Sequence, residues 1–247
     1  MTLSRVQLWI LALASLAALV GFAWPLTFPI STQAEQLGSG LMSVVAVLSL
    51  GAAVLFTLDR GFIGPKQLAL LGSLAGLASA TRIATAGVAG FELVFLFVIL
   101  GGFAYGPKFG FLLGALTILL SSVFFGGFGP WTAFQLFAVG WVGLGAGLLA
   151  KLRVARFQIP LLAGYAVFAS YLFGLIMNLW FWPFAVGSES SVSYRSGAEL
   201  TENLSSFLLY SLTSSTLSWD SVRAIALAIA ILSIGKPVLA VLRRAKL

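Results

Sequence analysis

The sequence predicts an all-α membrane protein, a polytopic bundle of transmembrane helices with about eight spans. Hydrophobic residues make up 60% of the 247 residues and charged residues only 9%, against about 25% charged in a typical soluble domain. The mean hydropathy is +1.06. A water-soluble fold of this length would have too few polar side chains to cover its surface, so the expected solvent is the lipid bilayer.

Eight apolar runs, interrupted by charges, glycines and prolines, define the expected helices. They cover residues 6–28, 41–58, 67–82, 91–106, 109–126, 131–150, 159–182 and 222–242. A helix needs about 20 apolar residues to span the bilayer, so the third and fourth runs are short. The first run is longer than the apolar part of a secretory signal peptide, and we expect it to remain as a helix.

The charged residues predict the orientation. If the N-terminus is cytoplasmic, the internal segments hold 11 of the 14 basic residues, as the positive-inside rule requires. Six of the seven acidic residues then lie outside. Removing or adding one span would destroy this asymmetry, so we expect a multi-pass protein of the cell membrane with both termini in the cytoplasm. The one long external loop, residues 183–221, contains a semi-apolar stretch at 203–212 that is a candidate for the membrane interface.

Several kinds of chemistry are missing from the chain. The sequence has no cysteine and no histidine, which removes disulfides, thiolate nucleophiles and histidine metal sites. It has no G-x-x-x-x-G-K-[ST] loop for ATP and no close pair of aspartates for Mg²⁺. The net charge of +7 is explained by membrane topology and not by nucleic acid. We therefore expect neither an enzyme nor a resident cofactor or metal, but a binding, transport or structural protein.

Two charged residues are expected below the outer membrane surface. Fifteen uncharged residues separate Lys66 from Arg82, and fifteen separate Glu92 from Lys108. Fifteen residues of helix reach only about 22 Å, whereas the hydrocarbon core is about 30 Å thick. Arg82 and Glu92 therefore face protein or a water-filled pocket. Two interpretations stay open, a ligand site and a structural ion pair.

Two polar and aromatic segments lie at the same predicted external side. The block G-G-F-G-P-W-T-A-F-Q, residues 126–135, presents Trp131 as a stacking surface and Gln135 as a hydrogen-bonding amide. The run N-L-W-F-W-P-F, residues 178–184, begins with Asn178, whose amide needs a partner in the bundle or a cavity. The alternative is an ordinary tight turn with interfacial aromatic residues. Together with the two charged residues above, these three side chains are predicted to line one external pocket.

Small residues recur at four-residue spacing and let helices approach closely. Gly72, Gly76 and Ala80 share one face of the third run, and Ala14 and Ala18 share a face of the first. Each stripe either packs within the chain or meets a partner. A further series around a predicted cytoplasmic turn is expected to pack internally; it consists of Gly106, Gly110 and Gly114.

Residues 67–242 resemble the substrate-binding S components of energy-coupling factor (ECF) vitamin transporters. The similarity rests on G-S-L-A-G-L-A-S-A in the third run, on G-P-K-F-G-F-L-L-G at a cytoplasmic turn and on the external block 126–135. The run 178–184 is similar to a bacterial subgroup labelled cobalamin-type. The resemblance implies a six-helix substrate-binding core, here residues 61–247, and leaves residues 1–60 as a two-helix extension that the family pattern lacks.

The same resemblance implies partners and a function. A transmembrane T subunit and cytoplasmic ATPase subunits would complete an ECF-type ABC importer, and a small-residue face of the first core helix would dock the T subunit. Gly72, Gly76 and Ala80 match that face, with glycine in place of alanine. The chain is then expected to capture a vitamin or related micronutrient at the external face. The alternatives are a self-contained secondary transporter or channel, and a membrane assembly or scaffold protein.

Overall fold

All regular structure in the described part of the chain is helical, which confirms the all-α part of the predicted fold class. The computed structural model describes residues 5–27, 64–86, 88, 90–152, 155–186 and 190–245. The expected helix at 41–58 lies outside these residues. The helices are α1 (Arg5–Phe22), α2 (Trp24–Thr27), α4 (Pro65–Ala84), α5 (Val94–Tyr105), α6 (Pro107–Ser122), α7 (Pro130–Leu149), α8 (Gln158–Ala185), α9 (Leu200–Ser211) and α10 (Ser221–Ala245). Short 3₁₀ turns cover Ala150–Leu152 and Ala155–Phe157, and a π-helix covers Leu212–Asp220.

Within the described residues, three helical stretches are long and apolar enough to cross a membrane: Trp131–Leu152, Gln158–Ala185 and Leu200–Ala245. Shorter apolar helices cover Trp9–Phe22, Val94–Tyr105 and Pro107–Ser122. These lengths and compositions fit a helical membrane protein. Seven of the eight predicted runs coincide with α1, α4, α5, α6, α7, α8 and α10, while the number of membrane crossings stays a prediction.

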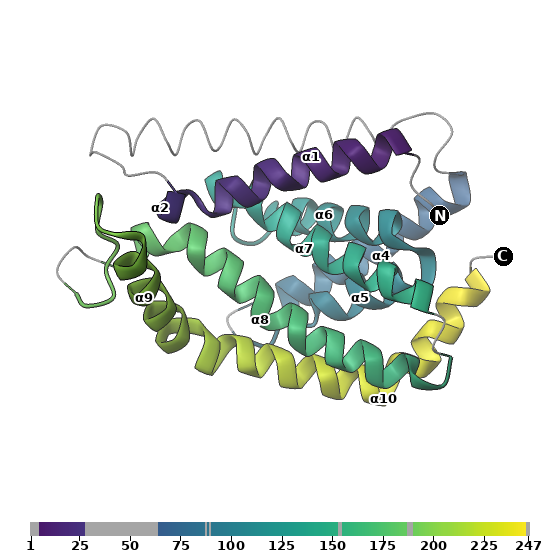
Figure 1. Ribbon diagram of the computed structural model, residues 1–247. Helices are drawn as coiled ribbons and strands as arrows, with labels where there is room; N and C mark the ends of the chain where they lie inside the picture. Colours follow the sequence, from purple (N-terminus) through teal and green to yellow (C-terminus); the bar gives the residue numbers. More distant parts are fainter. Residues whose placement is uncertain are drawn as a thin grey trace.

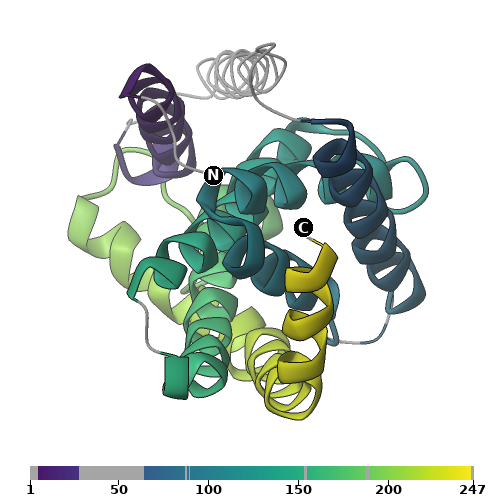
Figure 2. The ribbon, with the colours of Figure 1, turned by 90° about the vertical axis from the view of Figure 1, so that its right-hand side faces the viewer.

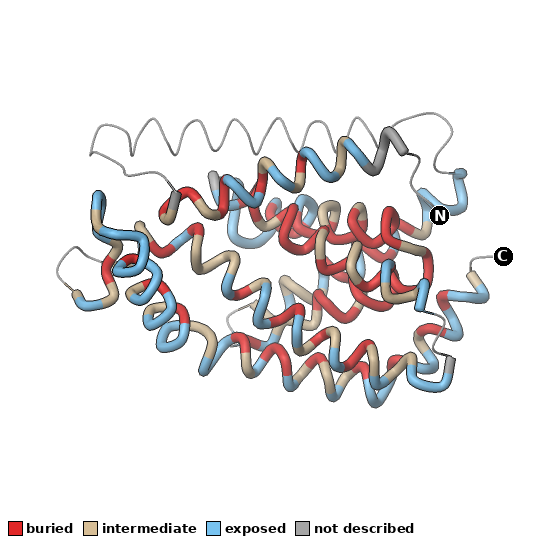
Figure 3. Tube along the Cα trace, viewed as in Figure 1, coloured by how far each residue is buried: buried red, intermediate tan, exposed pale blue. Residues whose placement is uncertain are grey.

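The helices run side by side along one long axis (Figure 1) and surround α5 when viewed from the end (Figure 2). The central helix packs against α4, α6, α7 and α10. All but one of its residues are buried, as Figure 3 shows by the red interior of the bundle. A helix that is apolar on every side is stable only in such a fully enclosed place. The outer faces of α8 and α10 keep large apolar side chains exposed.

Glycines bring α6 and α7 into backbone contact. A Cβ atom on Gly110 would overlap the carbonyl oxygen of Gly143, and one on Gly114 would overlap that of Val139. Gly106 has a φ of 102° in the tight turn between α5 and α6, which favours glycine. The predicted internal packing of this glycine series is therefore confirmed.

The small-residue stripe of α1 also packs within the chain. Ala14 and Ala18 are buried against Phe111 and Phe137. The Trp141 indole N–H, on α7, donates a hydrogen bond of 2.9 Å to the Ser15 hydroxyl. The first helix is thus attached to the body of the bundle through this face.

The predicted long loop is largely helical, so that expectation was wrong for residues 200–221. Helix α9, the π-helix and α10 form a continuous helical stretch from Leu200 to Ala245. The semi-apolar stretch 203–212 falls in α9, which buries Asn203, Phe207 and Ser211 on one face. These residues lie four apart, the spacing of one helix face, and α9 uses it to pack against α8.

Candidate functional site

An open pocket of about 410 Å³ lies between the first turns of α7 and the last third of α8. Its lining residues are Trp131, Gln135, Met177, Asn178, Trp180 and Phe181. Pockets for small molecules usually measure about 300–1,000 Å³. Three of the five predicted site residues, Trp131, Gln135 and Asn178, therefore meet at one cavity of suitable size.

The turn before α7 aims two of these side chains at the pocket. Gly126 and Gly127 have φ values of 84° and 64°, a region that other residues rarely adopt. The Gly129 backbone N–H donates a hydrogen bond of 2.9 Å to the Thr132 hydroxyl oxygen, which closes the first turn of the helix. Trp131 then lies in that first turn, and the glutamine four residues later lies on the same helix face.

Neighbouring helices hold both pocket amides. The Arg82 guanidinium, from α4, donates to Gln135 Oε1 over 3.5 Å and to the Ser121 hydroxyl of α6 over 2.7 Å. Its Cζ atom also lies 5.6 Å from the centre of the Phe125 ring. Asn178 Nδ2 donates to the Ser211 hydroxyl oxygen of α9 over 3.0 Å. Arg82 is thus attached to the pocket through Gln135 and does not itself line it.

Aromatic rings supply the rest of the pocket wall. Trp180 is buried, and its ring centre lies 5.4 Å from that of Phe134 and 5.6 Å from that of Phe184. The ring of Phe181 is stacked on Trp180. Among the described residues, no acidic side chain lines the cavity. The arrangement therefore suits a flat, partly apolar molecule that also accepts or donates a few hydrogen bonds.

Glu92, the fifth predicted residue, belongs to a different cluster. Its carboxylate accepts a hydrogen bond of 2.6 Å from Arg223 Nε and forms an ion pair with that arginine, and not with Arg82. Arg223 Nη1 also forms an ion pair with Asp220 at 2.7 Å and donates to the Ser170 carbonyl oxygen. For Glu92 the geometry favours the structural interpretation of the sequence.

This buried ion-pair cluster was missed by the sequence analysis. Asp220 is fully buried and Arg223 is only 5% exposed, with the guanidinium 5.1 Å from the Phe173 ring centre. Gly174 on α8 makes room for the aspartate, because a Cβ atom there would overlap the carboxylate. The available signal was the three-residue spacing of Asp220 and Arg223, which pairs side chains on a helix.

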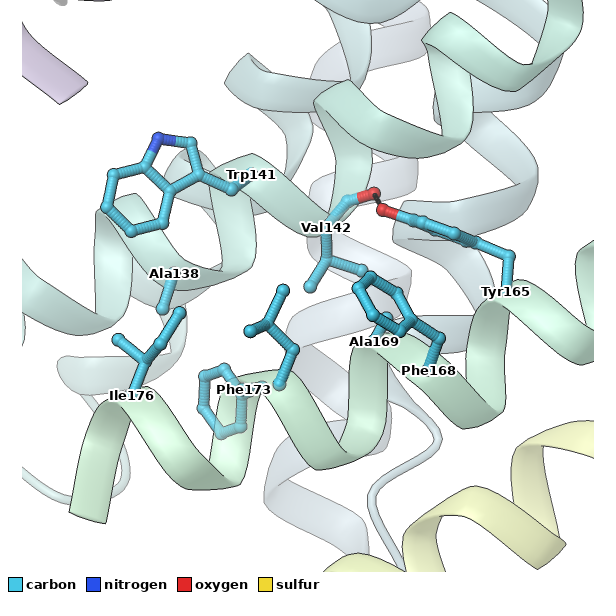
Figure 4. Close-up of a pocket in the computed structure, with 9 residues that line it drawn as sticks. Ala138, Trp141, Val142, Tyr165, Phe168, Ala169, Phe173 and Ile176 are labelled. Carbon is cyan, nitrogen blue, oxygen red and sulfur yellow. Dashed lines mark hydrogen bonds between the residues drawn. The ribbon is translucent and has the colours of Figure 1, made fainter. Parts of the chain in front are cut away.

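A second cavity, between α7 and α8, is too small for such a ligand. It measures about 50 Å³ and is lined mainly by apolar side chains. Figure 4 shows Phe168, Phe173 and Ile176 beside it, and the Tyr165 hydroxyl donating to the Val142 carbonyl oxygen over 2.7 Å. The Tyr165 hydroxyl and the Trp141 indole N–H are both already engaged, so the lining side chains in the described part of the chain leave no polar group for specific recognition.

The predicted docking stripe on α4 is open. Gly72, Gly76 and Ala80 are exposed, and a Cβ atom on either glycine would meet nothing within 4 Å among the described residues. This is the opposite of the buried glycines of α6. The stripe therefore has room for a closely packed helix.

The donor groups of the site point to an organic ligand. Within the described ranges, no group of three or more acidic residues is placed to hold a metal ion. The pocket amides and rings are instead suited to hydrogen bonding and stacking. No family model, no curated protein and no solved structure matches this chain.

Proposed function

We propose that the chain is the substrate-capture subunit of an ECF-type importer and binds a vitamin-like molecule in the pocket between α7 and α8. The observation that carries the proposal is the meeting of Trp131, Gln135 and Asn178 at one cavity of about 410 Å³. All three belong to the set of five residues that the sequence predicts for one external pocket.

The distribution of basic residues supports an external position for this pocket. The Tyr105 hydroxyl donates to the Leu242 carbonyl oxygen over 2.6 Å, and Arg243 donates to Gln158. These contacts join the ends of α5 and α10 and the start of α8. The helix ends gathered there carry a set of basic residues: Lys108, Lys151, Arg156, Arg243 and Arg244. By the positive-inside rule that end is cytoplasmic, so the aromatic pocket at the other end opens outside.

The pocket chemistry indicates a substrate class. Trp131 and Phe181 offer flat apolar surfaces, and Gln135 and Asn178 offer directional amides, which supply specificity in a mostly apolar site. The Arg82 guanidinium behind Gln135 adds positive charge close to the cavity. A conjugated ring system with an amide, carboxylate or phosphate group fits these features.

Partner subunits follow from the same proposal. The exposed α4 stripe, Gly72, Gly76 and Ala80, would contact a transmembrane T subunit. Separate ATPase subunits would supply the energy, since the sequence contains no P-loop. Lipid surrounds the remaining apolar outer faces.

Ligand retention tests the proposal. The full chain is purified in mild detergent from cells grown in rich medium, and the small molecules released on denaturation are identified by mass spectrometry. We expect one compound to be enriched in the wild type and lost in Trp131→Ala. The matched control is Trp9→Ala, which removes an exposed tryptophan of α1 (68% exposed) far along the chain from the pocket and should retain the compound.

Two other results would replace this function with its alternatives. If the purified chain alone moves the released compound across liposome membranes, it is a self-contained transporter. If no compound is enriched in the wild type, a scaffold or assembly role is the better account. An equal amount of compound in Trp131→Ala and wild type would place the binding site elsewhere.

A further inference from the structure

A third pocket, of about 370 Å³, lies at the opposite end of the bundle from the aromatic pocket. It is lined by the start of α8 and the last turns of α10, a helix that contains Pro237 and bends towards its C-terminal end (Figure 1). Its lining residues are Arg156, Gln158, Ile159, Lys236, Leu239 and Arg243. Three of the six are cations and none is acidic.

Two contacts position the side chain of Arg243, one of these cations. Its guanidinium donates to Gln158 Oε1 and lies 5.9 Å from the centre of the Phe103 ring. The hydrogen bond from the Tyr105 hydroxyl to the Leu242 carbonyl oxygen fixes the adjacent backbone. Binding a ligand here therefore requires little ordering of this side chain, which lowers the entropic cost.

Within the described residues, no acidic side chain compensates the charge of this pocket. Among the described residues, the ion pairs involve Arg195 and Arg223 as the basic partners, so Arg156, Lys236 and Arg243 have no acidic partner there. Like charges that share one pocket repel each other. An oxyanion removes this repulsion, and guanidinium groups bind phosphate oxygens through paired hydrogen bonds.

The walls of the pocket are not all polar. Leu239 is buried and Ile159 is half-buried, and both line the cavity. Phe157, next to Gln158 in the chain, is 67% exposed. Both α8 and α10 belong to stretches apolar enough to cross a membrane. A ligand with an anionic head and an apolar tail would satisfy the cations and these apolar side chains together.

We infer that this basic pocket binds the headgroup of an anionic phospholipid, with the acyl chains lying along the outer faces of α8 and α10. Basic pockets between transmembrane helices at the cytoplasmic side are suited to such headgroups, because that leaflet carries the anionic lipids. The inference is independent of the vitamin-like ligand and concerns the other end of the molecule.

Lipid titration followed by native mass spectrometry tests this site. The full chain in non-ionic detergent is titrated with phosphatidylglycerol, phosphatidylcholine or glycerol 3-phosphate. We expect phosphatidylglycerol to bind most tightly. The double variant Lys236→Gln/Arg243→Gln should weaken it by about twenty-fivefold, at about fivefold for each basic residue removed. The matched control, Lys66→Gln/Lys151→Gln, removes two exposed lysines outside the pocket and should bind as the wild type does.

Three results would overturn the assignment. One is an equal loss of phosphatidylglycerol binding in the pocket variant and the control, which would mean general charge attraction. Another is binding of glycerol 3-phosphate as tight as that of the lipid, which would make the ligand a soluble phosphate. The third uses the charge-keeping variant Lys236→Arg/Arg243→Lys, which should retain binding; if it loses binding like the glutamine variant, shape and not charge determines the site.

Discussion

At the scale of single residues, the burial of an arginine decides its role. Arg195 forms an ion pair with Glu202, seven residues later, and Arg223 forms one with Glu92, which is distant in the sequence. The Arg195 side chain is 56% exposed, whereas that of Arg223 is 6% exposed and has a second, fully buried partner in Asp220. Exposed pairs contribute little to stability, while removing one member of a buried group leaves an uncompensated charge.

This contrast gives a stability prediction. Arg223→Leu should destabilise the protein by about 3–5 kcal/mol, whereas Arg195→Leu should cost about 1 kcal/mol or less. The measurement is the melting temperature of each detergent-purified variant, followed by tryptophan fluorescence. Similar melting temperatures for the two variants would show that the buried cluster around Arg223 does not stabilise the bundle.

Arg82 has a different predicted role, because it contacts the pocket residue Gln135. Arg82→Ala should weaken binding of the compound identified from the wild type by about tenfold or more, because a hydrogen bond from a charged group is worth about 1.5–3 kcal/mol, while the amount of protein in the membrane stays the same. The control is Arg195→Ala, which removes an exposed arginine. Quantitative blotting of membranes accompanies the binding assay. A fall in the protein level of Arg82→Ala would instead assign this arginine to the stability of the fold.

The sequence predicted the pocket residues better than the charge pairing, for a physical reason. The predicted external ends of two consecutive helices carry Trp131, Gln135 and Asn178. The lengths of the apolar runs and their order along the chain therefore suffice to place these residues close together. The partner of Glu92 depends on how α10 packs against α5 and α8. No local spacing in the sequence contains that information.

At the scale of helices, the length of an apolar run predicts a helix correctly, whereas a polar composition does not correctly predict a loop. The runs that became α4–α8 and α10 are each bounded by charges, glycine or proline, which mark where a membrane helix ends. The stretch 200–220 is rich in serine and threonine, a composition that predicts a loop. It is helical because it buries one face against α8 and because Asp220 joins the ion-pair cluster, and both contacts are tertiary.

Glycines with the same spacing have different roles on different helices. Gly110→Leu should prevent correct folding, because even a Cβ atom would overlap Gly143 across the contact of α6 and α7. The atoms that the new side chain would overlap belong to the backbone, so no flexible side chain can move away to relieve the overlap. Size-exclusion chromatography of the detergent-solubilised variant should show aggregated or absent protein. A sharp monodisperse peak with wild-type melting behaviour would contradict the observed helix contact.

Gly76→Leu should leave the fold intact, because a Cβ atom at this position meets no described residue within 4 Å. We expect it to weaken co-purification with the proposed T subunit and ATPase subunits while the isolated chain still binds its ligand. Gly164→Leu on α8 is the matched control, since that glycine is also open but lies outside the α4 stripe. If Gly76→Leu loses both co-purification and ligand binding, the stripe packs within the chain. If Gly76→Leu and Gly164→Leu co-purify with the partner subunits equally well, the stripe contacts lipid.

At the scale of the whole molecule, the two ends of the bundle differ in chemistry. One end carries aromatic rings, amides and a pocket that no described acidic residue lines, and the other carries clustered basic residues around the basic pocket of α8 and α10. A membrane imposes such a difference, because its two faces have different lipids and the translocation of basic segments is disfavoured. The same asymmetry connects the proposed capture of substrate outside with energy supply from inside.

The orientation of the molecule can be measured directly. The chain contains no cysteine, so single cysteines can be introduced without removing any. Phe128→Cys and Ser205→Cys, at exposed positions near the aromatic pocket end, should react with a membrane-impermeant maleimide in intact cells. Lys151→Cys and Arg156→Cys, also exposed, should react only after the membrane is opened, because the basic end is expected in the cytoplasm. Labelling of Lys151→Cys or Arg156→Cys in intact cells would show that the orientation is the reverse of the expected one. The aromatic pocket would then face the cytoplasm, which is incompatible with capture of an external substrate.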